Sequence, residues 1–98
     1  MEAKKISQRS MEIQVRFFQA LDLLISSKEI KGLKTFCTDN NLHRAKYSNL
    51  RNHLNDPDNP GTGYKFIDID ALSYLTEKYH VSADWLLTGK GGMFEKKK

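Results

Sequence analysis

One segment, residues 36–50 with the sequence FCTDNNLHRAKYSNL, constrains the fold of this chain more than any other. A small residue, Cys37, directly follows an apolar one, which permits a second helix to cross close by. Asn41 stands where a tight turn needs a residue that tolerates a positive φ, and asparagine is the best choice besides glycine. The spacing predicts two short helices that cross steeply at this turn. The side chains expected to pack inside are Phe36, Cys37, Leu42, Tyr47 and Leu50.

The opposite face of the second of these helices is polar and cationic. A face of this kind suits a helix that enters the major groove of DNA. The segment is therefore predicted to be a helix-turn-helix, with its second helix reading base edges. The residues on that outward face are Arg44, Ala45, Lys46, Ser48, Asn49 and Asn52.

The positive charge of the chain is concentrated on the same segment. The 98 residues carry a formal charge of +4 at pH 7, and their composition is that of one soluble domain with a modest core. Residues 28–53 hold six Lys/Arg and two Asp/Glu, a balance of +4, against +1 for residues 1–27 and −1 for residues 54–98. This distribution fits a phosphate-binding surface. A lysine-rich face in contact with solvent explains the charge alone equally well.

Apolar periodicity predicts helices on both sides of this segment. Met11, Val15, Phe18, Leu21 and Leu24 recur at intervals of three and four, which predicts an amphipathic helix from Met11 to about Ser27. Ser10 is expected to cap it. Phe17 lies off its main apolar stripe and is expected to pack sideways. The next elements are expected to be a helix over 33–40, a turn over 41–43 and a helix over 44–54.

A loop and two more helices are expected to follow. Residues 55–63, NDPDNPGTG, combine Pro, Gly, Asn and Asp and predict a long loop. Asp68 or Asp70 is expected to cap a helix that runs to about His80. The buried face of that helix is expected to carry Ile69, Leu72, Leu75 and Tyr79. A short last helix, 83–87, is expected to begin after Ser82 and to end at Thr88 and Gly89. The predicted fold class is thus all-α with five helices, over residues 11–94, between a flexible N-terminal arm (1–10) and a basic tail (95–98).

The order of these elements resembles the lambda-repressor-like fold of Cro/repressor-type helix-turn-helix regulators, from Met11 to Phe94. The first motif that carries the resemblance is FCTDNNLHRAKYSNL, and the second is IDIDALSYLTEKYHVSADWLLTG, residues 67–89. The resemblance implies a five-helix DNA-binding domain with a central helix-turn-helix. This chain departs from the family pattern in its longer loop over 55–64 and in Asn40, which stands where an apolar residue is common.

The resemblance also implies which residues read bases. They are Arg44, Ala45 and Asn49, with Lys46 and Ser48 beside them. Arg44 is suited to a bidentate contact with guanine and Asn49 to one with adenine, while Ala45 suits a thymine methyl group. A polar face exposed to solvent is the alternative interpretation of these residues.

Contacts to phosphate are expected on both sides of the reading face. The N-terminal end of the helix over 33–40 suits an anion, because its free N–H groups and dipole are positive there. Such contacts position a protein on DNA without reading its sequence. The expected phosphate-contacting residues are Lys31, Lys34, Thr35, Arg51, Asn52 and His53, and ordinary surface charge is the alternative for each.

The sequence favours no other chemistry. The single cysteine, Cys37, belongs to a packing position, and the histidines lack metal-ligand spacing, so we expect no metal, no cofactor and no enzyme activity. No stretch is long and apolar enough to span a membrane and no signal-peptide pattern occurs, so a cytoplasmic location is expected.

The expected partner is double-stranded DNA, with no membrane or small-molecule ligand inferred. The resemblance implies binding by a homodimer on a palindromic site. The alternative is a protein-interaction module of the same fold, such as an adaptor or an antitoxin component. Under that alternative, an exposed apolar patch is expected from among Phe17, Tyr64, Phe66 and Phe94.

Overall fold

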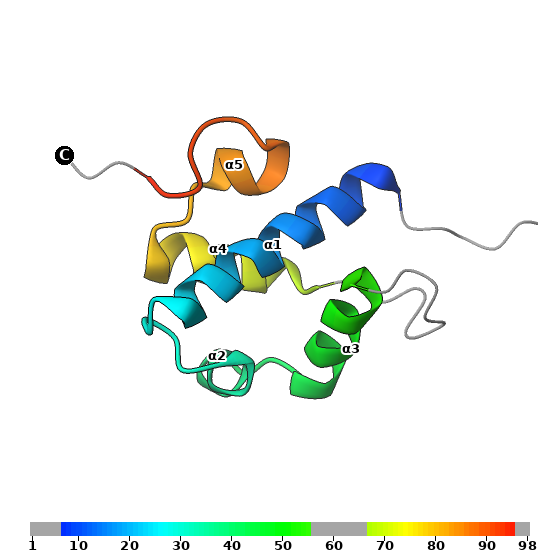
Figure 1. Ribbon diagram of the computed structural model, residues 1–98, viewed down its shortest axis with the longest axis vertical. Helices are drawn as coiled ribbons and strands as arrows, with labels where there is room; N and C mark the ends of the chain where they lie inside the picture. Colours follow the sequence, from blue (N-terminus) through cyan, green and yellow to red (C-terminus); the bar gives the residue numbers. More distant parts are fainter. Residues whose placement is uncertain (1–6, 56–66, 96–98) are drawn as a thin grey trace, which may run out of the picture.

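Five α-helices make up the part of the chain that the computed structural model describes, residues 7–55 and 67–95 (Figure 1). Within these residues no strand forms, and the one β-bridge joins Val81 to Phe94. The all-α prediction is confirmed. None of the described helices combines the length and hydropathy needed to cross a membrane. The helices are α1 (Gln8–Ser26), α2 (Leu33–Asp39), α3 (Arg44–Asn55), α4 (Ile69–Tyr79) and α5 (Ala83–Thr88).

The longest helix, α1, runs through the middle of the fold. Figure 1 shows α5 on one side of α1 and the α2–α3 pair on the other. Helix α1 contacts both α3 and α5, α2 packs against α3, and α4 packs against α5. Helix α1 therefore connects the two halves of the molecule.

Helix α1 begins three residues earlier than the sequence predicts. Ser7 has an extended backbone conformation, and its Oγ accepts a hydrogen bond from the N–H of Ser10 at 3.1 Å. The prediction that Ser10 is the cap is wrong, because the upstream serine satisfies that otherwise free N–H group. Residues 8–10 of the predicted arm thus belong to the helix, and residues 1–6 lie outside the described part.

The buried face of α1 is wider than its apolar stripe suggests. Phe17 is fully buried, and its ring centroid lies 5.0 Å from that of Phe18 and 6.0 Å from those of Phe36 and Tyr47. Val15, a member of the predicted stripe, is 39% exposed. Because α1 is contacted from two sides, positions off the stripe also face neighbouring helices. Phe17 lies off the main stripe and packs sideways into the core, as the pattern predicts.

Helix α4 faces the core differently from its prediction. Ile69 is 84% exposed, whereas Ile67, Ala71 and Leu75 are buried. The buried residues lie four positions apart and define the inward face, to which Ile69 does not belong. Leu72 and Tyr79 are partly buried against the core, as expected.

The chain closes around α5 as the sequence predicts. Ser82 Oγ accepts a hydrogen bond from the N–H of Trp85 at 3.3 Å, and Gly89 ends the helix with a φ of 77°. Residues 93–95 then return to the body of the molecule. The N–H of Ser82 donates to the Met93 carbonyl at 2.8 Å, and the N–H of Glu95 donates to the His80 carbonyl at 2.9 Å. Beyond Asn55, which ends α3, the predicted loop over 55–63 lies outside the described residues, as do residues 96–98 of the predicted tail.

Candidate nucleic-acid interface

The link between α2 and α3 has the turn geometry that its sequence predicts. Asn41 has a φ of 56°, and the N–H of Leu42 donates to the Cys37 carbonyl at 2.8 Å. The packing predictions for this segment are confirmed: Phe36, Cys37, Tyr47 and Leu50 are buried, and Leu42 is partly buried against the same core. One face of each helix is thereby held inside the molecule.

Asn40 occupies a buried position, with 5% of its surface exposed. Its Nδ2 donates to the Phe36 carbonyl at 2.8 Å, and its Oδ1 accepts a hydrogen bond from Lys78 Nζ on α4. A buried amide costs little when its groups are paired. The polar residue therefore ends α2 and leaves the register of the turn intact.

The outward face of α3 brings together four of the predicted base-contacting residues. Arg44, Ala45 and Asn49 are exposed, and Ser48 is partly exposed beside them. Together with His43 they line one shallow hollow. The Nδ1 of His43 accepts a hydrogen bond from the N–H of Lys46 at 3.2 Å and so satisfies a free group at the start of α3.

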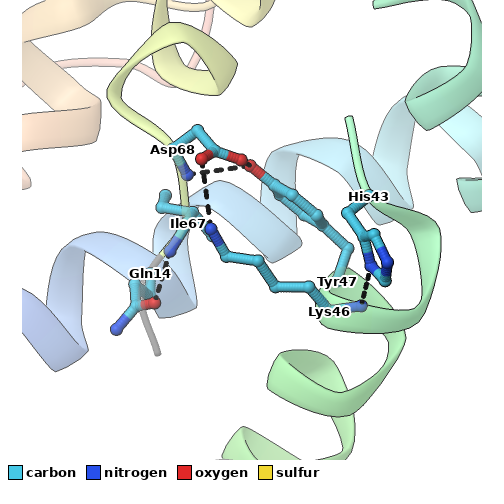
Figure 2. Close-up of polar contacts among 6 residues, drawn as sticks. All are labelled: Gln14, His43, Lys46, Tyr47, Ile67 and Asp68. Carbon is cyan, nitrogen blue, oxygen red and sulfur yellow. Dashed lines mark hydrogen bonds and ion pairs between the residues drawn. The ribbon is translucent and has the colours of Figure 1, made fainter. Parts of the chain in front are cut away.

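Lys46, the fifth predicted base-contacting residue, is directed at α4 instead (Figure 2). Its Nζ lies 3.1 Å from Asp68 Oδ1, and its side chain is 24% exposed. The Tyr47 hydroxyl donates to Asp68 Oδ2 at 2.7 Å and accepts from the Asp68 N–H at 2.8 Å. Asp68 holds the N-cap position of α4 but makes no side-chain cap bond there. The expected cap position is therefore confirmed at Asp68, but its carboxylate bonds to α3 and not to the N–H groups at the start of α4.

The contacts in this network shift the pKa values of Asp68 and Tyr47 in opposite directions. The hydrogen bond from Tyr47, and then the contact with Lys46, lowers the pKa of Asp68. Burial raises the pKa of Tyr47, so its hydroxyl keeps its proton. At pH 7 a charged carboxylate thus accepts a hydrogen bond from a neutral phenol.

The segment that leads into Asp68 is held against α1. Gln14 is 3% exposed, and its Oε1 accepts a hydrogen bond from the N–H of Ile67 at 3.1 Å (Figure 2). This buried contact satisfies a backbone donor just before α4 begins. Together, Gln14 and Tyr47 position the start of α4 relative to α1 and α3.

Arg51, expected to contact phosphate, is also directed inward. It forms an ion pair with Asp22 of α1, and its guanidinium carbon lies 5.9 Å from the centre of the Phe18 ring. Residues 28–53 have an excess of four positive charges in the sequence. Asp22 and Asp68, from outside this range, offset two of these positive charges by direct ion pairing.

The remaining predicted phosphate contacts lie at the surface. Lys31 and Lys34 are exposed and Thr35 is partly exposed around the start of α2, and Asn52 is exposed on α3. The side chain of His53 lies outside what the structure describes. The roles of these residues stay predictions.

Sequence reasoning missed both carboxylates that pair with α3. Asp68 has the local sequence of a helix cap, and its true partners are 21 and 22 residues away. Asp22 lies 29 residues from Arg51. In the sequence of α1 it has the appearance of an ordinary charged residue on the solvent-exposed face. No local pattern signals either pair.

The one cysteine has no exposed chemistry. Cys37 is fully buried, and burial raises the pKa of its thiol. Among the described residues, no three His, Cys, Asp or Glu side chains gather closely enough to hold a metal ion.

Comparison of the chain with protein-family models, with curated proteins and with solved structures gives no significant match. The fold and the geometry of α3 are therefore the features that bear on function.

Proposed function

We propose that this protein is a sequence-specific regulator of transcription that binds double-stranded DNA, most simply as a repressor. In this proposal α2 and α3 are a helix-turn-helix within a lambda-repressor-like domain, and α3 enters the major groove. The observation that carries the proposal is the division of α3. Its inner face is locked into the core through Tyr47 and Leu50, while Arg44, Ala45 and Asn49 stay exposed on the other.

The exposed side chains have the chemistry that base reading needs. The major groove is wide enough to admit an α-helix, and each base pair shows a distinct pattern of donors and acceptors there. Arg44 is assigned to guanine O6 and N7, Asn49 to adenine N6 and N7, and Ala45 to a thymine methyl group. One such helix covers few base pairs, so two copies are proposed to bind half-sites about one helical turn apart.

Selection of bound duplexes from a random pool, followed by fluorescence anisotropy on the selected site, tests the proposal. Arg44→Ala and Asn49→Ala are each expected to weaken binding by about 1–3 kcal/mol, roughly 5- to 150-fold, and to relax preference at one base position. Lys90→Ala and Gln19→Ala are matched controls, because both residues are exposed outside α3. Equal affinity for all duplexes, or unchanged binding by both α3 variants, would contradict the proposal.

A groove between α4 and α5 favours the second candidate, a protein-interaction module of the same fold. Its lining is mostly apolar and includes Ile69, Leu72, Leu86 and Leu87, of which Ile69 is 84% and Leu87 46% exposed. Exposed apolar surface of this kind often marks a protein contact.

The aromatic patch expected for this candidate is only partly tested. Phe17 is buried and does not contribute, Phe94 is 38% exposed, and Tyr64 and Phe66 lie outside the described residues. Stoichiometric capture of one protein, without salt-sensitive binding to any duplex, would favour this candidate over DNA binding.

A further inference from the structure

Helix α3 carries three Lys/Arg side chains, and two of them are neutralised by carboxylates from other helices. Lys46 pairs with Asp68 before α4, and Arg51 pairs with Asp22 on α1. Arg44 is the exposed one. Helix α3 is therefore held by ion pairs at two positions along its length, and its exposed side chains lie between these positions and next to them.

The two carboxylates are themselves partly exposed. The side chain of Asp68 is 42% exposed and that of Asp22 is 55% exposed, against 24% for Lys46 and 28% for Arg51. Charges at such positions act on an approaching polyanion within the Debye length, about 8–10 Å at moderate ionic strength. Each pair thus presents a carboxylate at the surface and keeps its cation nearer the protein.

This arrangement bears on the balance between general and sequence-specific binding. Sequence-independent affinity for DNA grows with the number of phosphates that cations neutralise, whereas specificity depends on contacts to base edges. A helix whose cations are held in intramolecular ion pairs has a lower sequence-independent affinity for DNA, while its contacts to base edges are unaffected. Repulsion of unwanted complexes is a recognised source of specificity.

We propose that Asp22 and Asp68 are specificity-determining residues, which withhold Arg51 and Lys46 from phosphates so that Arg44 and Asn49 decide which duplex is bound. The inference rests on the proposed function of α3. It assigns to two acidic side chains outside α3 the role of limiting sequence-independent binding.

Asp22→Asn and Asp68→Asn in the full chain test the inference. Binding is measured from 50 to 200 mM salt on a selected duplex and on a scrambled one. Each substitution is expected to release one cation, to steepen the slope of log K against log salt by about 0.9, and to raise affinity for the scrambled duplex on the order of tenfold at 0.1 M salt. The ratio of specific to scrambled affinity is expected to fall.

Two further variants separate local withholding from net charge and from altered folding. Asp84→Asn removes an equal charge on α5, on the other side of α1 from α3 (Figure 1), and is expected to leave the slope unchanged. Lys46→Met combined with Asp68→Asn removes the released cation and is expected to restore the wild-type slope. Asp22→Asn leaves the Tyr47 hydrogen bond intact, so it tests the inference where Asp68→Asn perturbs the fold.

The outcomes distinguish the inference from the proposed function. If the wild-type protein binds neither duplex in a salt-dependent manner, the proposed function fails. If it binds the selected duplex specifically but neither Asn variant changes the slope or the affinity ratio, the inference alone fails. An equal effect of Asp84→Asn also overturns it, because net charge then suffices.

Discussion

At the scale of single residues, Asp68 takes part in three hydrogen bonds that join α3 to the start of α4. It accepts from Tyr47 and from Lys46, and its own N–H donates to the Tyr47 hydroxyl. The hydroxyl lies at the end of a fully buried ring, where an unpaired polar group would cost about 1–3 kcal/mol. The network satisfies that group and joins α3 to the start of α4.

Acid should remove part of this stabilisation. Because the hydrogen bond from Tyr47 lowers the pKa of Asp68, the folded state favours the carboxylate. The stability it contributes is fully present above the pKa of an unfolded aspartate, about 3.9, and is lost as the pH falls through the lowered value. We expect the stability difference between wild type and Asp68→Asn, at most about 1 kcal/mol after solvent screening, to shrink between pH 7 and pH 3 in urea unfolding. A constant difference would contradict this account.

At the scale of elements, α1 shows where periodicity succeeds and where it fails. The pattern identifies a helix and places Phe18, Leu21 and Leu24 correctly in the core. It fails for Val15, which is exposed, and the stripe alone does not include the buried Phe17, because a helix contacted from two sides has no single buried stripe. The prediction for Ile69 on α4 is also wrong. Ile69 is apolar, and is therefore expected in the core, but its position on the helix faces solvent.

Substitutions on α1 distinguish the two positions. Phe17→Ala is expected to cost about 3–5 kcal/mol of unfolding free energy, because it removes a ring that contacts three other aromatic rings. Val15→Ala, two residues earlier and 39% exposed, is expected to cost under about 1 kcal/mol. Urea unfolding followed by circular dichroism measures both. Similar losses of unfolding free energy for the two variants would contradict this account of which positions on α1 are buried.

At the scale of the whole molecule, the part of the fold that sequence predicts is the part set by neighbouring residues. The turn at Asn41, the cap at Ser82 and the stop at Gly89 are local and were all predictable. The ion pairs of Lys46 and Arg51 join residues more than twenty positions apart and depend on how helices are placed. The exposure of Arg44 and Asn49 was therefore predictable from the sequence, whereas the ion pairing of Lys46 and Arg51 was not.

The return of residues 93–95 to the body of the molecule is another long-range feature. A chain that ends at Gly92 loses the two backbone hydrogen bonds with His80 and Ser82 and the packing of Met93. We expect a loss of about 1–3 kcal/mol, seen as a lower thermal midpoint. A chain that ends at Glu95 keeps those contacts and serves as the control. Equal midpoints for the two truncations would show that the returning segment adds nothing.

The position of Trp85 has an optical consequence. It is the one tryptophan of the chain and lies partly buried where α5 meets α1, with Met11 and Arg16 lining the same hollow. Figure 1 places α5 across α1 from α3. The fluorescence of Trp85 is therefore expected to report whether α5 is packed against α1. A ligand bound to α3 is expected to leave this emission largely unchanged. The protein thus contains its own folding probe, separate from the surface on which binding is proposed.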